Sequence, residues 1–131
     1  MKEVTAAIIK KGDKILIAKR AQGEKLAGKW EFPGGKIENG ETPVECIKRE
    51  IREELDVEIE VLKFYHESSY SYEHGEIKLL AYLCRLVSGD FLLKVHSCIE
   101  WINVKNFNIN SYDFAPADIS ILNKLMSEAD G

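Results

Sequence analysis

Short apolar runs separated by polar turns make up most of the chain, and they predict β-strands. The runs at residues 4–9 and 15–19 are rich in β-branched residues and flank the turn Lys11-Gly12-Asp13-Lys14, so we expect an opening hairpin. A glycine- and lysine-containing loop follows at 22–29. The predicted strands are residues 4–9, 15–19, 30–32, 36–38, 58–65, 68–72, 77–86 and 99–104.

Two segments interrupt the strands with helical periodicity. Thr42 and Glu45 form a capping-box pattern around Pro43, a residue suited to the first helical position, and the helix should end near Leu55. A second helix should begin near Pro116. Its apolar positions at helical spacing are Ile119, Leu122, Leu125 and Met126.

The order β-β-β-β-α-β-β-β-β-α predicts an α+β sandwich in which a mixed sheet lies between helices. A length of 131 residues fits a single domain, residues 1–131, and the 45% hydrophobic and 31% charged fractions are those of an ordinary globular protein. The chain opens without a signal-peptide pattern, so we expect a cytoplasmic protein. Three widely spaced cysteines, Cys46, Cys84 and Cys98, should be buried small hydrophobes in a reducing compartment.

The net charge of -4 and the pI near 5.4 argue against nonspecific binding of a nucleic-acid polymer, which requires a broad basic surface. A small anionic ligand stays compatible with this charge, because a metal ion and a few cationic side chains can neutralise it locally. We therefore expect neither a nucleic-acid nor a membrane partner, and a monomer or weak homodimer.

The first helix gathers carboxylates beside its apolar face. Glu50, Glu53 and Glu54 stand at i, i+3 and i+4, in the arc next to the one that should face the core, Val44, Ile47, Ile51 and Leu55. Three carboxylates at the edge of a core repel one another and need a counter-ion. With oxygen ligands and neither His nor Cys in the pattern, Mg²⁺ is favoured and Mn²⁺ can substitute. The alternative is an acidic surface helix paired with Arg49 and Arg52.

The residues around this helix favour the metal. Paired glycines in Phe32-Pro33-Gly34-Gly35-Lys36 let the backbone approach a ligand, and Glu41 stands just before the helix cap. The segment 35–57, GKIENGETPVECIKREIREELDV, resembles the Nudix box Gx5Ex7REUxEExGU, in which U is apolar. Asp56 departs from the pattern, which has Gly at this position. Asp tolerates the left-handed conformation common after a helix, so we expect a small stability cost and no loss of chemistry.

This resemblance to the MutT-like Nudix hydrolases implies an α/β/α sandwich and cleavage of a nucleoside triphosphate into nucleoside monophosphate and pyrophosphate. It implies that Glu50, Glu53 and Glu54 hold the metal, together with a carbonyl of Gly34 or Gly35. Arg49 would orient the carboxylates, and the cations would neutralise charge as water attacks phosphorus. The resemblance makes Glu53 the first candidate for the catalytic base and Glu100, which precedes Trp101, the second.

Other segments extend the resemblance and suggest how a substrate binds. Arg20 and Lys36 are candidate phosphate partners, and Phe32 is a candidate neighbour of the base. Asp118 stands in a Pro-Ala-Asp sequence that resembles relatives acting on CTP, dCTP or modified cytosine nucleotides, whereas enzymes that hydrolyse 8-oxo-dGTP have Asn there. An acceptor carboxylate suits an exocyclic amino group. Alternatively, the negative charge of Asp118 near the start of the second helix could simply interact favourably with the helix dipole.

Two alternatives remain open from the sequence. One is an 8-oxo-dGTP diphosphatase, and the other, from a different class, is a noncatalytic nucleotide-sensing Nudix domain. Such domains usually lose box carboxylates, and all of them are present here. His66, His74 and His96 show no ligand spacing, so the sequence assigns them no role.

Overall fold

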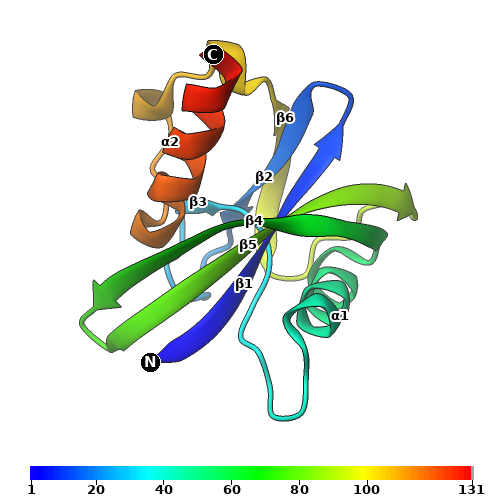
Figure 1. Ribbon diagram of the computed structural model, residues 1–131, viewed down its shortest axis with the longest axis vertical. Coiled ribbons are helices and arrows are strands. Elements are labelled where there is room, and N and C mark those ends of the chain that lie inside the picture. Colours follow the sequence, from blue (N-terminus) through cyan, green and yellow to red (C-terminus); the bar gives the residue numbers. More distant parts are fainter. Residues whose placement is uncertain (131) are drawn as a thin grey trace.

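A mixed sheet lies between two helices in the computed structural model, which describes residues 1–130 (Figure 1). This α+β arrangement confirms the predicted fold class. Two short 3₁₀ turns, η1 and η2, precede the second helix. The elements are β1 (Lys2–Lys11), β2 (Lys14–Arg20), β3 (Trp30–Glu31), α1 (Pro43–Leu55), β4 (Glu58–Tyr72), β5 (Gly75–Ser88), β6 (His96–Ile102), η1 (Val104–Asn106), η2 (Ile109–Ser111) and α2 (Pro116–Asp130).

Strand β1 occupies the centre of the sheet. It pairs with β5 in parallel from Lys2↔Ile77 to Lys10↔Arg85, and with β2 antiparallel only near the hairpin turn. Strand β4 pairs with β5, while β2 pairs with both β3 and β6. The order is therefore β3-β2-β1-β5-β4, with β6 also beside β2.

Each face of the sheet packs against one helix, as Figure 1 shows. Ile8 of β1 points to a core closed by α2, and the next residue, Ile9, points to a core closed by α1. This follows from the alternation of side chains along a strand. Helix α2 contributes Ile121, Leu122 and Leu125, and α1 contributes Ile47, Ile51 and Leu55. Among the described residues, no helix has the length and apolar run that crossing a membrane requires.

Several local predictions were wrong. Residues 58–65 and 68–72 form one strand, β4, whose pairing with β5 shifts register at three places. Residues 36–38 make only an isolated bridge, Val4↔Lys36. On α1, Val44 is exposed, and the fully buried Cys46 takes an inward place in the first turns. Cys84 is buried as expected, but Cys98 is exposed on β6, opposite Lys19.

Candidate functional site

Helix α1 begins and ends where the sequence predicted. The Thr42 N–H donates to Glu45 Oε1 at 2.9 Å, and the Glu45 N–H donates to Thr42 Oγ1 at 3.1 Å, which completes the capping box. At the other end Asp56 adopts the left-handed conformation, with φ 58°, and its N–H donates to the Arg52 carbonyl at 3.0 Å. The two caps fix the ends of the helix that carries the carboxylates.

The Gly34-Gly35 loop is packed tightly between β1 and α1. The Ala7 N–H donates to the Pro33 carbonyl at 2.7 Å, and the Thr5 N–H donates to the Gly35 carbonyl at 2.8 Å. A Cβ on Gly34 would lie 2.1 Å from the Thr5 carbonyl oxygen, and one on Gly35 would lie 2.3 Å from the Glu50 carboxyl carbon. The Gly34 position therefore requires glycine, because the clash there is with backbone, whereas a Cβ at Gly35 would displace the Glu50 carboxylate, which lies directly against the loop.

The two glycine carbonyls differ in what they can still bind. Gly35 O accepts the Thr5 N–H, the Thr5 hydroxyl at 3.1 Å and the Cys46 thiol at 3.4 Å. Across residues 1–130, no loop or side-chain hydrogen bond ends on Gly34 O. Of the two carbonyls named from the sequence, Gly34 O is the better candidate for a metal ligand.

Arg49 donates hydrogen bonds to three carboxylates and lies 3.8 Å from a fourth, that of Glu38. We call Glu41, Arg49, Glu50 and Glu53 the Arg49 cluster. The Arg49 guanidinium donates to Glu41 at 3.0 Å, to Glu50 at 2.8 Å and to Glu53 at 3.2 Å. The hydrogen bond from Arg49 lowers the pKa of Glu41 to about 2, and these carboxylates raise the pKa of Arg49. Glu53 is the most exposed of the three, with 59% of its side chain accessible.

Glu54 lies on the inner side of the same helix, and with Glu31 and His96 it forms what we call the Glu54 cluster. One potential ligand atom from each residue lies within 4.8 Å of the others. In the described part of the chain, Glu54 Oε1 is hidden from solvent without a hydrogen-bond partner. Burial, with the charges of Glu31 and Glu50, raises the pKa of Glu54 to about 9. Burial also raises the pKa of Glu50.

Sequence reasoning missed Glu31 and His96. His96 Nε2 lies 2.9 Å from Glu31 Oε2, and Arg20 Nη1 donates to the same oxygen at 2.9 Å. This contact joins residues 65 positions apart, and it forms because β2 pairs with β3 on one side and β6 on the other. A charged residue inside Trp30-Glu31-Phe32 was the available signal, whereas nothing in the sequence around His96 pointed to the contact.

A cavity of about 310 Å³ lies beside the glycine loop and the start of α2. All four predicted substrate residues line it, although they come from distant parts of the chain. Glu31, Gly34 and Gly35 also line it, so it reaches both the Glu54 cluster and the candidate carbonyl ligand. The predicted substrate residues in its wall are Arg20, Phe32, Lys36 and Asp118.

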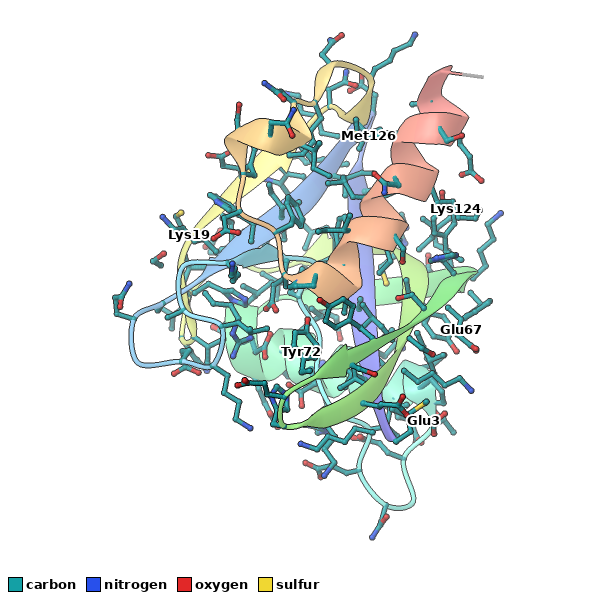
Figure 2. All side chains as sticks on the ribbon, turned by 90° about the vertical axis from the view of Figure 1, so that its left-hand side faces the viewer. Glu3, Lys19, Glu67, Tyr72, Lys124 and Met126 are labelled. Carbon is teal, nitrogen blue, oxygen red and sulfur yellow. The ribbon has the colours of Figure 1, made fainter. Side chains whose placement is uncertain are left out.

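Asp118 is buried in the wall of this cavity. Its Oδ2 accepts the Phe32 N–H at 2.8 Å, and burial together with the charge of Glu31 raises its pKa well above the usual range. Phe32 packs against Phe114, with ring centroids 6.1 Å apart. Tyr72, labelled in Figure 2, accepts the Ala117 N–H at 3.2 Å and ties β4 to the start of α2. Asp118 is thus held in place by the loop that precedes α1.

Glu100 lies apart from the other predicted site residues. On β6 it pairs with Ile17, whose side chain belongs to the core closed by α2. Paired residues on adjacent strands point to the same face, so Glu100 faces away from α1. There the Tyr112 hydroxyl donates to it. The structure does not bring Glu100 to the carboxylates of α1.

The α1 carboxylates and the glycine loop fit a divalent cation. Glu54 offers a buried oxygen that lacks a partner among residues 1–130, Gly34 offers a carbonyl, and Glu50 lies against the loop. An all-oxygen donor set of this kind suits a hard ion.

Comparison with known proteins agrees with this geometry. The NUDIX domain profile matches residues 1–125. The chain is 35% identical over 127 residues to CTP pyrophosphohydrolase of Escherichia coli, covering 97% of this chain and 93% of the relative. It is 32% identical to 8-oxo-dGTP diphosphatase of the same organism, covering 94% and 95%. The crystal structure of the MutT protein from Methanosarcina mazei Go1 has the same fold, with a TM-score of 0.86 at 18% identity over 99% of this chain and 96% of that one. The chain therefore belongs to the NUDIX domain family and is a Nudix hydrolase.

Proposed function

We propose that this Nudix hydrolase cleaves nucleoside triphosphates into nucleoside monophosphate and pyrophosphate with Mg²⁺, for which Mn²⁺ can substitute, and that its substrates are cytosine nucleotides. The observation that carries the proposal is the cavity beside the glycine loop, whose wall includes the cations Arg20 and Lys36 together with the buried Asp118. A nucleotide combines a polyanionic phosphate chain with a hydrogen-bonding base, so it offers a partner to both kinds of wall residue.

At the phosphate end, Arg20 and Lys36 would bind the phosphate chain. Glu50, Glu53, Glu54 and Gly34 O would hold the cation, which supplies charge neutralisation for the leaving pyrophosphate when bound. Glu53 is exposed and hydrogen-bonded to Arg49, so it can accept a proton from the attacking water. Water adds to phosphorus, the bond to the bridging oxygen breaks, and pyrophosphate leaves.

At the base end, Asp118 supports a cytosine nucleotide. Its Oδ2 accepts the Phe32 N–H, which leaves Oδ1 available to a ligand. An acceptor oxygen matches the exocyclic amino group of cytosine. The relative named CTP pyrophosphohydrolase, at 35% identity, adds to this support.

The raised pKa of Asp118 favours a second candidate, 8-oxo-dGTP. A protonated carboxyl presents one donor and one acceptor, and the edge of a guanine base offers the complementary pair. The relative named 8-oxo-dGTP diphosphatase, at 32% identity, is consistent with this alternative.

Pyrophosphate release from a panel of CTP, dCTP, 5-methyl-dCTP and 8-oxo-dGTP tests the proposal. We expect kcat/KM for at least one cytosine nucleotide to exceed that for 8-oxo-dGTP by about 10-fold or more, the discrimination of one good hydrogen-bonded contact. If kcat/KM is instead higher for 8-oxo-dGTP than for the cytosine nucleotides, 8-oxo-dGTP becomes the assigned substrate. Binding without turnover across the panel would instead support a nucleotide-sensing domain.

A pair of variants tests the role of Glu53. Glu53→Gln should lower kcat by about 100-fold or more, because the amide cannot accept the proton. Glu58→Gln is the matched control, since Glu58 is also exposed and arginine-paired but belongs to neither cluster. An unchanged kcat in Glu53→Gln would exclude Glu53 as the base.

A further inference from the structure

Tyr72 lines the cavity beside the glycine loop, and its hydroxyl has an unused donor. Tyr72 is the last residue of β4, and its hydroxyl accepts the Ala117 N–H at 3.2 Å. Among residues 1–130 this hydroxyl donates to no residue, Asp118 included. A phenol hydroxyl has a proton to donate besides the lone pair with which it accepts. Its proton is therefore available to a molecule in the cavity.

The Tyr72 ring contacts two neighbouring aromatic side chains. The imidazole of His74 stacks on it, with ring centroids 5.2 Å apart and ring planes at 10°. Tyr70 packs beside it, with centroids 4.7 Å apart and planes at 53°. Contacts at such distances are favourable and hold the ring in place. Because His74 covers one face of the ring and Tyr70 packs beside it, Tyr72 offers a ligand mainly its hydroxyl.

The surroundings keep this hydroxyl in its protonated, donating form. Burial raises the pKa of Tyr72, and the charges of Asp118 and Glu31 raise it as well, against the opposing effect of the hydrogen bond from Ala117. The Ala117 N–H also engages the hydroxyl as an acceptor. The hydroxyl therefore faces the cavity as a hydrogen-bond donor at neutral pH.

The Tyr72 hydroxyl and the Asp118 carboxyl are tied to consecutive positions at the start of α2. The Ala117 N–H binds the hydroxyl, and Asp118, the next residue, is held by the Phe32 N–H at 2.8 Å through Oδ2. Asp118 Oδ1 receives no hydrogen bond from the described residues, so this part of the wall presents an acceptor and a donor. Cytosine has the complementary edge, because its exocyclic amino group donates and the adjacent ring nitrogen N3 accepts. Uracil presents the reverse order, a carbonyl and a ring N–H.

We propose that Tyr72 is a specificity-determining residue whose hydroxyl donates a hydrogen bond to the ring nitrogen N3 of cytosine, next to the amino group that Asp118 accepts. The inference rests on the proposed function, since it requires the base of a cytosine nucleotide in this cavity. The hydroxyl favours cytosine over uracil, because the ring N–H of uracil would meet a second donor. A contact to the base, away from the reacting phosphorus, is made equally before and during the reaction, so it acts on KM rather than on kcat.

Steady-state hydrolysis of CTP and of 3-deaza-CTP, in which a C–H group replaces N3, tests this in wild type and Tyr72→Phe. Tyr72→Phe should raise KM for CTP by about 3- to 10-fold at unchanged kcat, the net contribution of one neutral hydrogen bond. The KM for 3-deaza-CTP should not rise, because this analogue offers the hydroxyl no acceptor. Tyr65→Phe is the matched control, since it removes a hydroxyl that donates to Glu128 on the same strand but outside the cavity. Its KM for CTP should equal that of the wild type.

The ratio of kcat/KM for CTP to that for UTP is a second readout, and it should fall by about 3- to 10-fold in Tyr72→Phe. A merely structural role, in which the hydroxyl only ties β4 to Ala117, would lower Tm and raise KM for all three nucleotides by the same factor. That result would overturn the proposal, as would an unchanged KM for CTP.

The same measurements separate this proposal from the proposed function. If the wild type hydrolyses CTP and Tyr72→Phe does so with the same KM, only the hydroxyl contact fails. If the wild type hydrolyses no cytosine nucleotide, the proposed substrate class fails, and the contact from Tyr72 to cytosine fails with it.

Discussion

The Arg49 cluster and the Glu54 cluster use carboxylates of the same helix, yet their charges are balanced in opposite ways. Arg49 donates to three carboxylates and holds the pKa of Glu41 at about 2. One helical turn after Glu50, Glu54 turns inward beside another acidic residue, and its pKa rises to about 9. The protein thus neutralises one set of carboxylates with its own arginine, whereas Glu54 is buried without such a partner among residues 1–130.

This difference follows from the position of each side chain on α1. Glu53 has 59% of its side chain exposed, where water screens its charge, whereas Glu54 Oε1 lies out of contact with solvent. A buried charge without a partner costs stability, and proteins accept that cost chiefly at functional sites. Glu54 is therefore the residue at which stability and activity should oppose each other most strongly.

The largest effect is expected for Glu54→Gln. Mutation of residues that only hydrogen-bond to a metal ligand lowers activity by about 10- to 100-fold. Loss of a proposed ligand itself should therefore lower kcat by at least about 100-fold. The same change removes a buried ionisable group, so the metal-free variant should have a higher Tm than the metal-free wild type near neutral pH. Steady-state kinetics and thermal unfolding in EDTA measure the two effects. If Glu54→Gln has a lower Tm than the wild type in EDTA, Glu54 stabilises the metal-free protein. That result would contradict the contrast drawn between the Arg49 cluster and the Glu54 cluster.

A smaller effect is expected for Arg49→Lys. A lysine ammonium is a single point charge and cannot span three carboxylates as the planar guanidinium does. We expect kcat to fall by about 10- to 100-fold, because Glu50 and Glu53 lose their orientation. Arg52→Lys is the control, since Arg52 is exposed and pairs with Glu58 outside both clusters. Equal kinetics in the two variants would mean that Arg49 does not orient the carboxylates.

Metal removal should expose a pH dependence of stability that comes from Glu54. The ordinary pKa of a glutamate is 4.5, and that of Glu54 in the fold is about 9, so between these values the unfolded chain binds fewer protons. Stability in EDTA should therefore decrease as pH rises from about 6 to about 8. Saturating Mg²⁺ should weaken this trend because it neutralises the ionised carboxylate.

Thermal unfolding of wild type and Glu54→Gln across that pH range measures this contribution. The slope in EDTA should be flatter in the variant, and Asp118 and Glu50, whose pKa values are also raised, contribute to the slope that remains. An identical slope in both proteins would show that Glu54 does not titrate in this range.

The fold could be predicted from the sequence where local rules decide it. Thr42, Pro43 and Glu45 defined the start of α1, and short apolar runs rich in β-branched residues defined β1 and β2. What failed depended on distant contacts. Residues 36–38 looked like a strand but bridge only to Val4, and β4 runs through a polar stretch because β5 supplies its hydrogen bonds.

The candidate site divides in the same way. The α1 carboxylates follow from helix periodicity, and the cavity brings the four predicted substrate residues together. Glu31 and His96 could not be paired from the sequence, since their contact depends on the register of β2 with two other strands. The same register places Glu100 on the face of α2, which no local pattern reveals.

The smallest effect is expected at Asp56, which caps α1 at the end of the helix that carries both clusters. Its φ of 58° is a left-handed conformation that costs an L residue free energy and costs glycine none. Asp56→Gly should therefore raise the free energy of unfolding by about 0.5–1 kcal/mol, after allowing for the greater flexibility of glycine in the unfolded chain. Urea denaturation measures this gain, and kcat should stay at the wild-type value because the Asp56 N–H still donates to Arg52. A fall in kcat would show that the Asp56 side chain serves the site as well as the helix end.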